Sequence, residues 1–113
     1  MSLESLLLPN EHIMFRTAQP VMYGQSRYNA YVTNIRFILH ASRGLFSRDD
    51  LVAYKLTDLQ HFKYHEEGLI FRTGVLTITL PNSFNKIAGP TADMKQLYQH
   101  AMGLAHAGTP RAL

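Results

Sequence analysis

The feature that most constrains the fold of this chain is a pair of alternating runs between residues 28 and 40. Tyr28, Ala30 and Val32 occupy every second position of the first run, and after Asn34 the alternation restarts. Period-two alternation is typical of half-buried strands, and a short break at Asn is typical of a tight hairpin turn. Because Asn tolerates a positive φ angle, we expect Asn34 to take the strained turn position of a β-hairpin.

The same alternation recurs along most of the chain, between clusters of Gly, Pro, Asn and Asp that favour turns. About seven short strands at near-regular spacing predict an antiparallel meander that closes into a barrel or a sandwich. Residues 81–89 lack the alternation, so we expect a loop there. The predicted strands cover residues 11–18, with a resumption at 21–23, then 28–33, 35–40, 51–56, 59–65, 69–73 and 75–80.

Two helical segments flank the predicted strands. Residues 91–105 carry an apolar stripe at the spacing of one helix face, which predicts an amphipathic helix that buries the stripe against the sheet. Residues 2–8 predict a short helix that ends at Pro9, and its leucines can pack on their own domain or dock on another chain. We expect one domain over residues 1–105 and a flexible tail over residues 106–113.

The composition excludes several classes of function. The chain of 113 residues is long enough to bury its own core, so it needs no metal or disulfide to fold. It contains no Cys, which excludes disulfides, thiol nucleophiles and cysteine-ligated zinc, and fits a cytoplasmic setting. The net charge is +3, but the basic residues are scattered, so we expect no nucleic-acid partner. The apolar runs fall far below the roughly 20 residues of a membrane-spanning helix.

No pattern in the sequence points to catalysis or to a bound cofactor. A nucleophile elbow, a phosphate-binding loop and a glycine-rich dinucleotide turn are all absent, so we expect a protein that is not an enzyme and has no cofactor. His61, Lys63 and His65 share one predicted strand face, and the histidines could join Glu66 or Glu67 in a zinc site. Since no second pair of residues has metal-ligand spacing, we interpret the three as an exposed polar strand face and expect no metal.

Three short motifs follow one another along the first half of the chain. Residues 8–13 read Leu-Pro-Asn-Glu-His-Ile, residues 31–38 read Tyr-Val-Thr-Asn-Ile-Arg-Phe-Ile, and residues 43–48 read Arg-Gly-Leu-Phe-Ser-Arg. In order and spacing they resemble the "L-P-x-E-x-I", "y-x-T-N-x-R-x-I" and "G-L-x-x-R" elements of bacterial pleckstrin-homology domains. Residues 56–59 are similar to the next element of the family but lack its Pro, and two later glycines also match.

The resemblance, which spans about residues 8–105, implies a pleckstrin-homology (PH)-like barrel of about seven antiparallel strands in two near-orthogonal sheets, capped by one amphipathic helix. It also implies a non-enzymatic interaction module, and some members of the family look like ring-forming oligomers. Eukaryotic relatives include phosphoinositide binders with several Lys and Arg residues in the first hairpin loop, whereas residues 19–26 contain no basic residue here. We expect Arg36, within the second motif, to form a structural pair with Asp58.

We expect the chain to act through protein contacts, mainly by assembling into a homo-oligomer with cyclic symmetry. The strand predicted at 75–80 has no charged residue or Pro within it to protect an exposed edge. With Leu76 and Ile78 facing the core, its opposite face would be uncharged and β-branched, which suits packing against a neighbouring subunit. The predicted contacts are Leu3, Leu6, Leu7, Val75, Thr77 and Thr79.

Peripheral binding of lipid headgroups is the alternative interaction. Loops at 19–27, 43–50 and 66–68 are expected to emerge at one end, and their acidic residues offset their arginines, so we expect a nearly neutral rim and little contact with membranes. The adjacent Leu45 and Phe46 can insert at a membrane or complete the core. The candidate rim residues are Arg27, Arg43, Leu45, Phe46 and Arg48. A third possibility, a small-molecule carrier, is disfavoured because the helix and bulky aromatic residues would fill the barrel.

Overall fold

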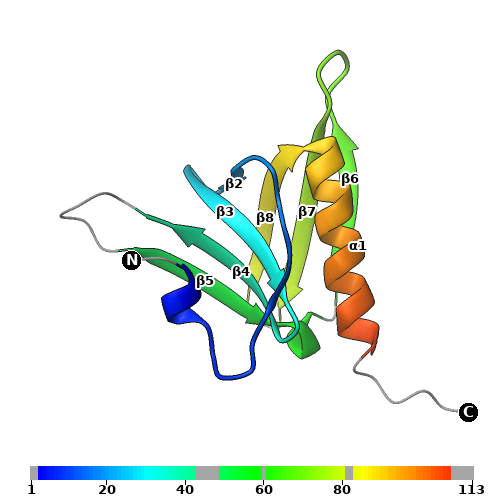
Figure 1. The fold of residues 1–113 in the computed structure, drawn as a ribbon. Coiled ribbons are helices and arrows are strands. Elements are labelled where there is room, and N and C mark those ends of the chain that lie inside the picture. The colour runs from blue at the N-terminus through cyan, green and yellow to red at the C-terminus, as the bar shows by residue number, and fades with distance from the viewer. Residues whose placement is uncertain (1–2, 43–48, 60, 81–82, 108–113) are drawn as a thin grey trace, which may run out of the picture.

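A computed structural model of the chain describes residues 3–42, 49–59, 61–80 and 83–107. Within these residues the chain forms eight β-strands, two short 3₁₀ helices and one C-terminal α-helix (Figure 1). The elements are η1 (Leu3–Leu6), β1 (Ile13–Arg16), β2 (Val21–Tyr23), β3 (Ser26–Thr33), β4 (Arg36–Ala41), β5 (Asp50–Lys55), η2 (Leu56–Asp58), β6 (His61–Glu67), β7 (Thr73–Leu80), β8 (Ser83–Pro90) and α1 (Thr91–Ala107).

Strand β3 joins two layers of antiparallel strands. One edge of β3 pairs with β4, which confirms the predicted hairpin, and its other edge pairs first with β2 and then with β1. The strand order is β5-β4-β3-β2-β8-β7-β6, with β1 added beside β3. Figure 1 shows β3, β4 and β5 running across the direction of β6, β7 and β8, so the two layers enclose one core between them.

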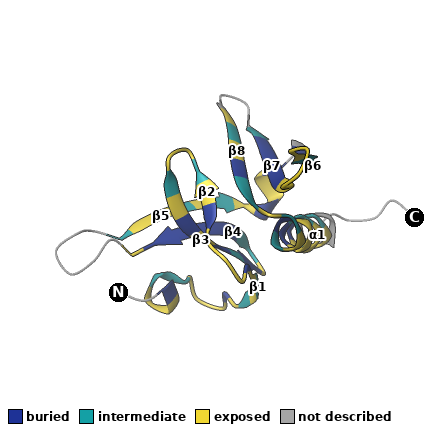
Figure 2. Cartoon of the chain, turned by 90° about the horizontal axis from the view of Figure 1, so that it is seen from above, coloured by how far each residue is buried: buried dark blue, intermediate teal, exposed yellow. Residues whose placement is uncertain are grey.

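Apolar side chains from both layers and from α1 fill this core. Phe62 of β6 meets Phe37 of β4 edge-on, with ring centroids 5.8 Å apart, and stacks on Tyr98 of α1 at 5.7 Å. Leu76 and Ile78 of β7 are completely buried in the same cluster, as predicted. Figure 2 shows the buried residues concentrated in β3, β4 and β7 and recurring along α1.

Helix α1 approaches the sheet closely because two glycines lie beneath it. Met94, Leu97 and Ala101 are completely buried, which confirms the apolar stripe predicted for this helix. A Cβ atom at Gly74 would lie 2.7 Å from the Cβ of Met94, and one at Gly89 would lie 2.9 Å from its sulfur. A larger residue at either position would push the helix away from β7 and β8.

The largest departure from the sequence prediction is β8. Residues 81–89, predicted as a loop, contain most of this strand, which pairs with β7 along its length and with β2 near its end. Its alternation is weak because Asn85 and Gly89 stand at inward positions where the pattern expects apolar residues. Hydrogen bonds from strands on both sides stabilise an extended conformation that the local sequence does not favour.

The connection between β6 and β7 also differs from the prediction. Residues 69–73 were expected to form a strand, but the chain turns up to Arg72, and β7 begins at Thr73 and continues through Gly74 without the predicted break. Glu67 and Thr73 form the last pair of the β6–β7 ladder, so the intervening residues reverse the chain. Pairing between the two strands decides where the turn lies, whereas consecutive apolar residues alone resemble a buried strand.

Smaller corrections concern the ends of the chain and one turn. The N-terminal segment is the 3₁₀ turn η1 rather than a helix over 2–8, and α1 includes residues 106 and 107, which were expected to begin a flexible tail. Residues 108–113 of the predicted tail lie outside the described residues. Among the described non-glycine residues, a positive φ occurs at Asn10 (65°) and not at Asn34, so the turn geometry predicted for Asn34 is wrong.

The seating of α1 leads to a prediction about stability. Leu97→Ala should lower the free energy of unfolding by about 2–5 kcal/mol, because it leaves a cavity where a fully buried side chain packs between α1 and the sheet. Urea unfolding followed by circular dichroism measures this loss. Gln99→Ala, at an exposed position of the same helix, is the control and should leave the midpoint nearly unchanged. Equal midpoints for the Leu97→Ala variant and the native chain would contradict the docking of α1.

Candidate functional site

The most exposed apolar residues of the described chain lie at the end of the β6–β7 hairpin. Leu69, Ile70 and Phe71 are 101%, 86% and 88% exposed, and we call these three residues the apolar tip. Figure 1 shows this hairpin end projecting beyond the rest of the domain, past the first turn of α1. Large apolar side chains that remain together in water usually mark a surface that contacts another molecule.

The apolar tip has a defined conformation. Gly68 has a φ of 107°, and a Cβ atom there would collide with the carbonyl oxygen of Phe71, so glycine is required for this turn. At the base of the turn the Glu66 carboxylate pairs with Lys95 of α1 at 3.4 Å and with Arg72 at 3.5 Å. These ion pairs connect both sides of the turn to the helix.

Tyr64 keeps the Glu66 carboxylate charged. Its hydroxyl donates a hydrogen bond of 2.9 Å to Glu66, and this bond, followed by the ion pair with Lys95, lowers the pKa of Glu66. Burial, and then the same hydrogen bond, raise the pKa of Tyr64 to about 12. Both groups therefore keep their charge state at neutral pH, and the base of the tip is held together by charge-assisted contacts.

The outer face of β6, β7 and β8 contains a cavity of about 570 Å³, which we call the sheet cavity. The strand register aligns Lys63, Thr77 and Lys86 in one row across it, and Thr79 lies beside Phe84 in the next row. The Phe84 side chain is 61% exposed, and the Lys86 ammonium lies 5.9 Å from the centroid of its ring. Both lysines are exposed, so the sheet cavity combines an exposed aromatic ring with two positive charges.

The predicted oligomer contacts on β7 lie on an inner strand of the sheet rather than on an edge strand. Strand β7 lies between β6 and β8, so the prediction of an open edge at 75–80 is wrong, and the reason is that β8 pairs with it. Val75 and Thr77 are buried among neighbours on the outer face. Thr77 and Thr79 nevertheless line the sheet cavity, where another molecule can reach them. Their contact with another copy of the chain stays a prediction.

The N-terminal leucines lie against their own domain. Leu3 is buried, Leu6 and Leu7 are half-buried, and the Leu6 carbonyl accepts a hydrogen bond of 3.3 Å from Arg36 of β4. Of the two arrangements left open by the sequence, packing on the same domain is the one observed. A contact between this segment and another copy stays a prediction.

Of the candidate rim residues, Arg27 belongs to the described part of the chain, whereas Arg43, Leu45, Phe46 and Arg48 lie outside it. Arg27 is exposed and lines a second hollow of about 400 Å³ on the sheet surface. Among the described residues that line this hollow, Arg27 alone is charged. The hollow therefore lacks the cluster of cations that an anionic headgroup needs.

The polar face of β6 shows a histidine–carboxylate contact. His65 Nε2 lies 2.9 Å from the carboxylate of Glu67, and this contact lowers the pKa of Glu67. In the described ranges no group of three His, Asp or Glu side chains is arranged to hold a metal ion. A search of the same residues finds no helix with the length and apolarity to cross a membrane.

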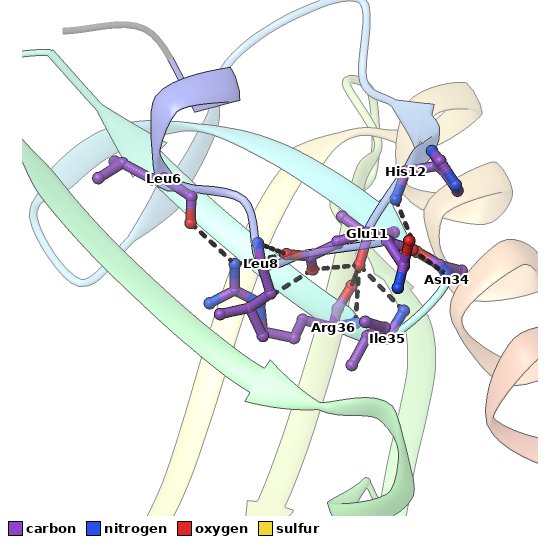
Figure 3. Close-up of polar contacts among 9 residues, drawn as sticks. Leu6, Leu8, Glu11, His12, Asn34, Ile35 and Arg36 are labelled. Atoms are coloured by element: carbon purple, nitrogen blue, oxygen red, sulfur yellow. Dashed lines mark hydrogen bonds and ion pairs between the residues drawn. The ribbon is translucent and has the colours of Figure 1, made fainter.

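A buried carboxylate joins the N-terminal segment to the β3–β4 hairpin (Figure 3). The Glu11 side chain is completely buried, and its Oε1 atom accepts hydrogen bonds from Arg36 Nη2 at 2.7 Å and from the Leu8 amide at 2.8 Å. Its Oε2 atom accepts from Arg36 Nε at 2.9 Å and from the Thr33 hydroxyl at 2.6 Å. Arg36 therefore binds the carboxylate through two parallel hydrogen bonds, the strongest geometry for such a pair.

Asn34 adds a second link between the same segments. Its Oδ1 atom accepts a hydrogen bond from the His12 amide at 2.7 Å, and its Nδ2 atom donates to the Asn10 carbonyl at 3.1 Å. Asn34 thus acts by binding a distant segment rather than through its own φ angle. The predicted pair of Arg36 with Asp58 is also wrong, because the N-terminal segment crosses the hairpin and places Glu11 against Arg36.

The two layers joined by β3 and capped by α1 have a counterpart among solved structures. The chain matches the pleckstrin homology domain from Shewanella amazonensis SB2B with a TM-score of 0.59, over 89% of this chain and 93% of that one, at 17% sequence identity. The chain has a PH-like fold. Neither a protein-family model nor a curated protein matches the sequence.

The PH-like fold brings together the motifs that resemble those of bacterial PH domains. The first motif supplies Glu11 and the second supplies Thr33, Asn34 and Arg36, and the two meet in the network of Figure 3. The fold class predicted from the sequence is confirmed. The Glu11 carboxylate of this network is buried and fully paired, so the network is structural and the exposed surfaces are the candidates for contacts with other molecules.

The sequence prediction did not identify the apolar tip. One signal for it was available, since Glu66, Glu67 and Gly68 mark a turn and a regular alternation resumes only at Thr73. A hairpin that pairs Glu67 with Thr73 leaves the three intervening apolar residues in the loop. Those residues were interpreted as a strand because consecutive apolar residues are also typical of buried strands.

The buried Glu11–Arg36 pair predicts how stability depends on pH. The hydrogen bond from Arg36 is the main reason that the pKa of Glu11 falls from 4.5 to about 2. A carboxylate with a lowered pKa stabilises the folded state above its ordinary pKa, and this contribution is lost as the pH falls from 4.5 towards 2. At pH 7, Glu11→Gln should lower the free energy of unfolding by about 3–5 kcal/mol, because Arg36 loses its buried partner.

Urea unfolding at a series of pH values tests this prediction. The difference between the native chain and Glu11→Gln should narrow as the pH falls through the interval from 4.5 to about 2. Glu4→Gln, which changes an exposed carboxylate on η1, serves as the control and should have little effect at any pH. A difference that stays constant over the acid range would show that the Glu11 charge is not the source of the stability.

Proposed function

We propose that this PH-like domain is a non-catalytic interaction module that assembles with copies of itself, and that the apolar tip is its main contact. The observation that supports this most is the exposure of Leu69, Ile70 and Phe71 on a protruding turn. Gly68 permits this turn, and the ion pairs of Glu66 connect its base to α1. A surface of this kind has apolar area to bury against another molecule.

The energetics of the apolar tip favour an assembly with several contacts. Burial of one Leu, Ile or Phe side chain contributes about 1.5–3 kcal/mol, whereas association costs several kcal/mol in lost translational and rotational freedom. One small contact therefore gives a weak dimer. A closed ring, in which each subunit makes two contacts, is more stable as a whole than the sum of isolated pairs.

The charges around the tip argue against the alternative, binding of anionic lipid headgroups. At the base of the tip Glu66 and Glu67 offset Arg72 and Lys95, so the positive field that attracts such lipids is weak. Arg27 lines its hollow without a second cation among the described residues. Insertion of the tip into a bilayer would then depend on three apolar side chains alone, which gives marginal membrane binding.

Replacement of the apolar tip by serine should abolish self-association. We expect the native chain at tens of micromolar to sediment as a species several times heavier than its 12.9 kDa monomer. The triple variant Leu69→Ser/Ile70→Ser/Phe71→Ser should sediment as the monomer, because the contact loses its apolar area. Its circular-dichroism spectrum should match that of the native chain, because these side chains are exposed and contribute nothing to the core.

The matched control is Met14→Ser, which removes an apolar side chain that is 53% exposed on β1, away from the tip. This variant should keep the native sedimentation. A native chain that stays monomeric at all accessible concentrations would refute the proposed function. Oligomers that persist in the triple serine variant would refute the role of the tip.

A vesicle experiment separates self-association from lipid binding. At physiological salt the native chain should show little co-sedimentation with phosphatidylcholine vesicles, with or without phosphoinositide, because the tip region is nearly neutral. Strong co-sedimentation that disappears in the triple serine variant, together with a monomeric native chain, would assign the tip to membranes instead. Co-sedimentation that disappears in Arg27→Ala would support headgroup binding by the loop arginines.

A further inference from the structure

We propose that the sheet cavity of one copy receives the apolar tip of the next copy, so that subunits assemble head to tail. This inference rests on the proposed self-association and adds to it the surface that accepts the tip. The argument combines the chemistry of the two surfaces, their charges and their positions along the same pair of strands.

Phe62, Phe84 and Met102 contribute apolar surface to the sheet cavity beside its polar and charged lining. Its volume of about 570 Å³ lies within the roughly 300–1,000 Å³ of pockets that bury small organic ligands. Phe84 leaves most of its ring exposed beside this cavity, and Met102 of α1 also lines it. An incoming Phe71 ring can pair with the Phe84 ring, and the flexible Met102 side chain can adapt to the aliphatic residues of the tip.

The outer face of the sheet carries charges of both signs at the sheet cavity and beside the tip. The sheet cavity carries the exposed ammonium groups of Lys63 and Lys86. Beside the tip, Glu67 has a side chain that is 59% exposed on the outer face of β6, where it contacts His65 and interacts with Lys86 of its own copy, whereas Glu66 is paired with Arg72 and Lys95. When the tip of one copy enters the cavity of the next, Glu67 approaches the two lysines. Opposite charges at such a rim favour the correct orientation and oppose a symmetric contact between two tips or two cavities.

The positions of the two surfaces prevent the tip from contacting the sheet cavity of its own copy. In β7, Thr77 of the cavity lies four residues from Thr73, a distance of roughly 13 Å along the strand. The turn that carries the tip extends from Thr73 in the opposite direction (Figure 1). The tip of a copy therefore points away from its own cavity. Because the contact joins two different patches, it is heterologous and produces either a closed ring or a filament.

Complementary variants test this arrangement. The first is the triple serine variant, which lacks the tip but keeps the cavity. The second is Phe84→Glu, which keeps the tip and places a carboxylate where the exposed ring stood. Each variant alone should sediment as the monomer. In an equimolar mixture the average mass should rise from 12.9 kDa towards twice that value as the concentration increases, because a single intact tip and a single intact cavity remain to form one weak contact.

Met22→Glu is the matched control for the cavity variant. Met22 is exposed on the same face of the sheet but lines the hollow beside Arg27 rather than the sheet cavity. This variant should keep the native assembly, which separates an effect at the cavity from a general effect of charge on the sheet. Circular dichroism of each variant should match that of the native chain.

The outcomes distinguish this inference from the proposed function. If Phe84→Glu keeps the native oligomer while the triple serine variant is monomeric, self-association through the tip stands and the sheet cavity is not its partner. If both variants are monomeric and the average mass of their mixture does not rise even at the highest accessible concentration, the head-to-tail contact is wrong. A native chain that is itself monomeric overturns both proposals.

Charge-reversing substitutions provide a second test of the contact. They change exposed side chains and therefore leave the core intact. Lys63→Glu should raise the dissociation constant of the contact by about tenfold or more, because it places a carboxylate in the cavity opposite Glu67 of the next copy. Mixing Lys63→Glu with Glu67→Lys should restore part of the lost affinity, since the altered cavity then meets the altered tip. No effect of either substitution on assembly would contradict the proposed orientation.

Discussion

The rest of the structure depends on the ion pair between Glu11 and Arg36. It joins the N-terminal segment to the β3–β4 hairpin, and Thr33 and the Leu8 amide complete the hydrogen bonds of the buried carboxylate. A buried carboxylate needs such partners, because an unpaired charge in a protein interior is very costly. With these contacts the N-terminal segment stays close to one end of β3. The other end of β3 then pairs with β2, which connects the first layer of strands to the second.

Side chains occupy the interior of the domain, so the candidate binding surfaces lie on its exterior. Helix α1 sits directly on Gly74 and Gly89, and aromatic rings from β4, β6 and α1 fill the space between the layers. A ligand inside the barrel would have to displace these close-packed side chains. The apolar tip instead lies at the end of the β6–β7 hairpin, and the sheet cavity lies on the outer face of β6, β7 and β8. Two different exposed surfaces suit directional contacts with other molecules.

Local patterns predicted much of the framework. The alternation around Asn34 identified the β3–β4 hairpin, and the stripe through Met94, Leu97 and Ala101 identified α1, because both patterns report directly which side chains are buried. The order of the short motifs led to the PH-like fold. Strand β8 was missed because Asn85 and Gly89 interrupt its alternation, and its extended conformation depends on β7 and β2 rather than on its own residues.

The sequence by itself determined which residues avoid water and at what period, and from that the hairpin, the C-terminal helix and the fold class follow. The tertiary structure decided the features that depend on pairing between distant segments, namely the position of a turn and the order of the strands. The Glu67–Thr73 pair left Leu69, Ile70 and Phe71 in a turn instead of a strand, and β8 turned β7 from an edge strand into an inner one. Local side-chain periodicity does not specify strand register or the order of strands in a sheet, because these depend on hydrogen bonds between residues far apart in the chain.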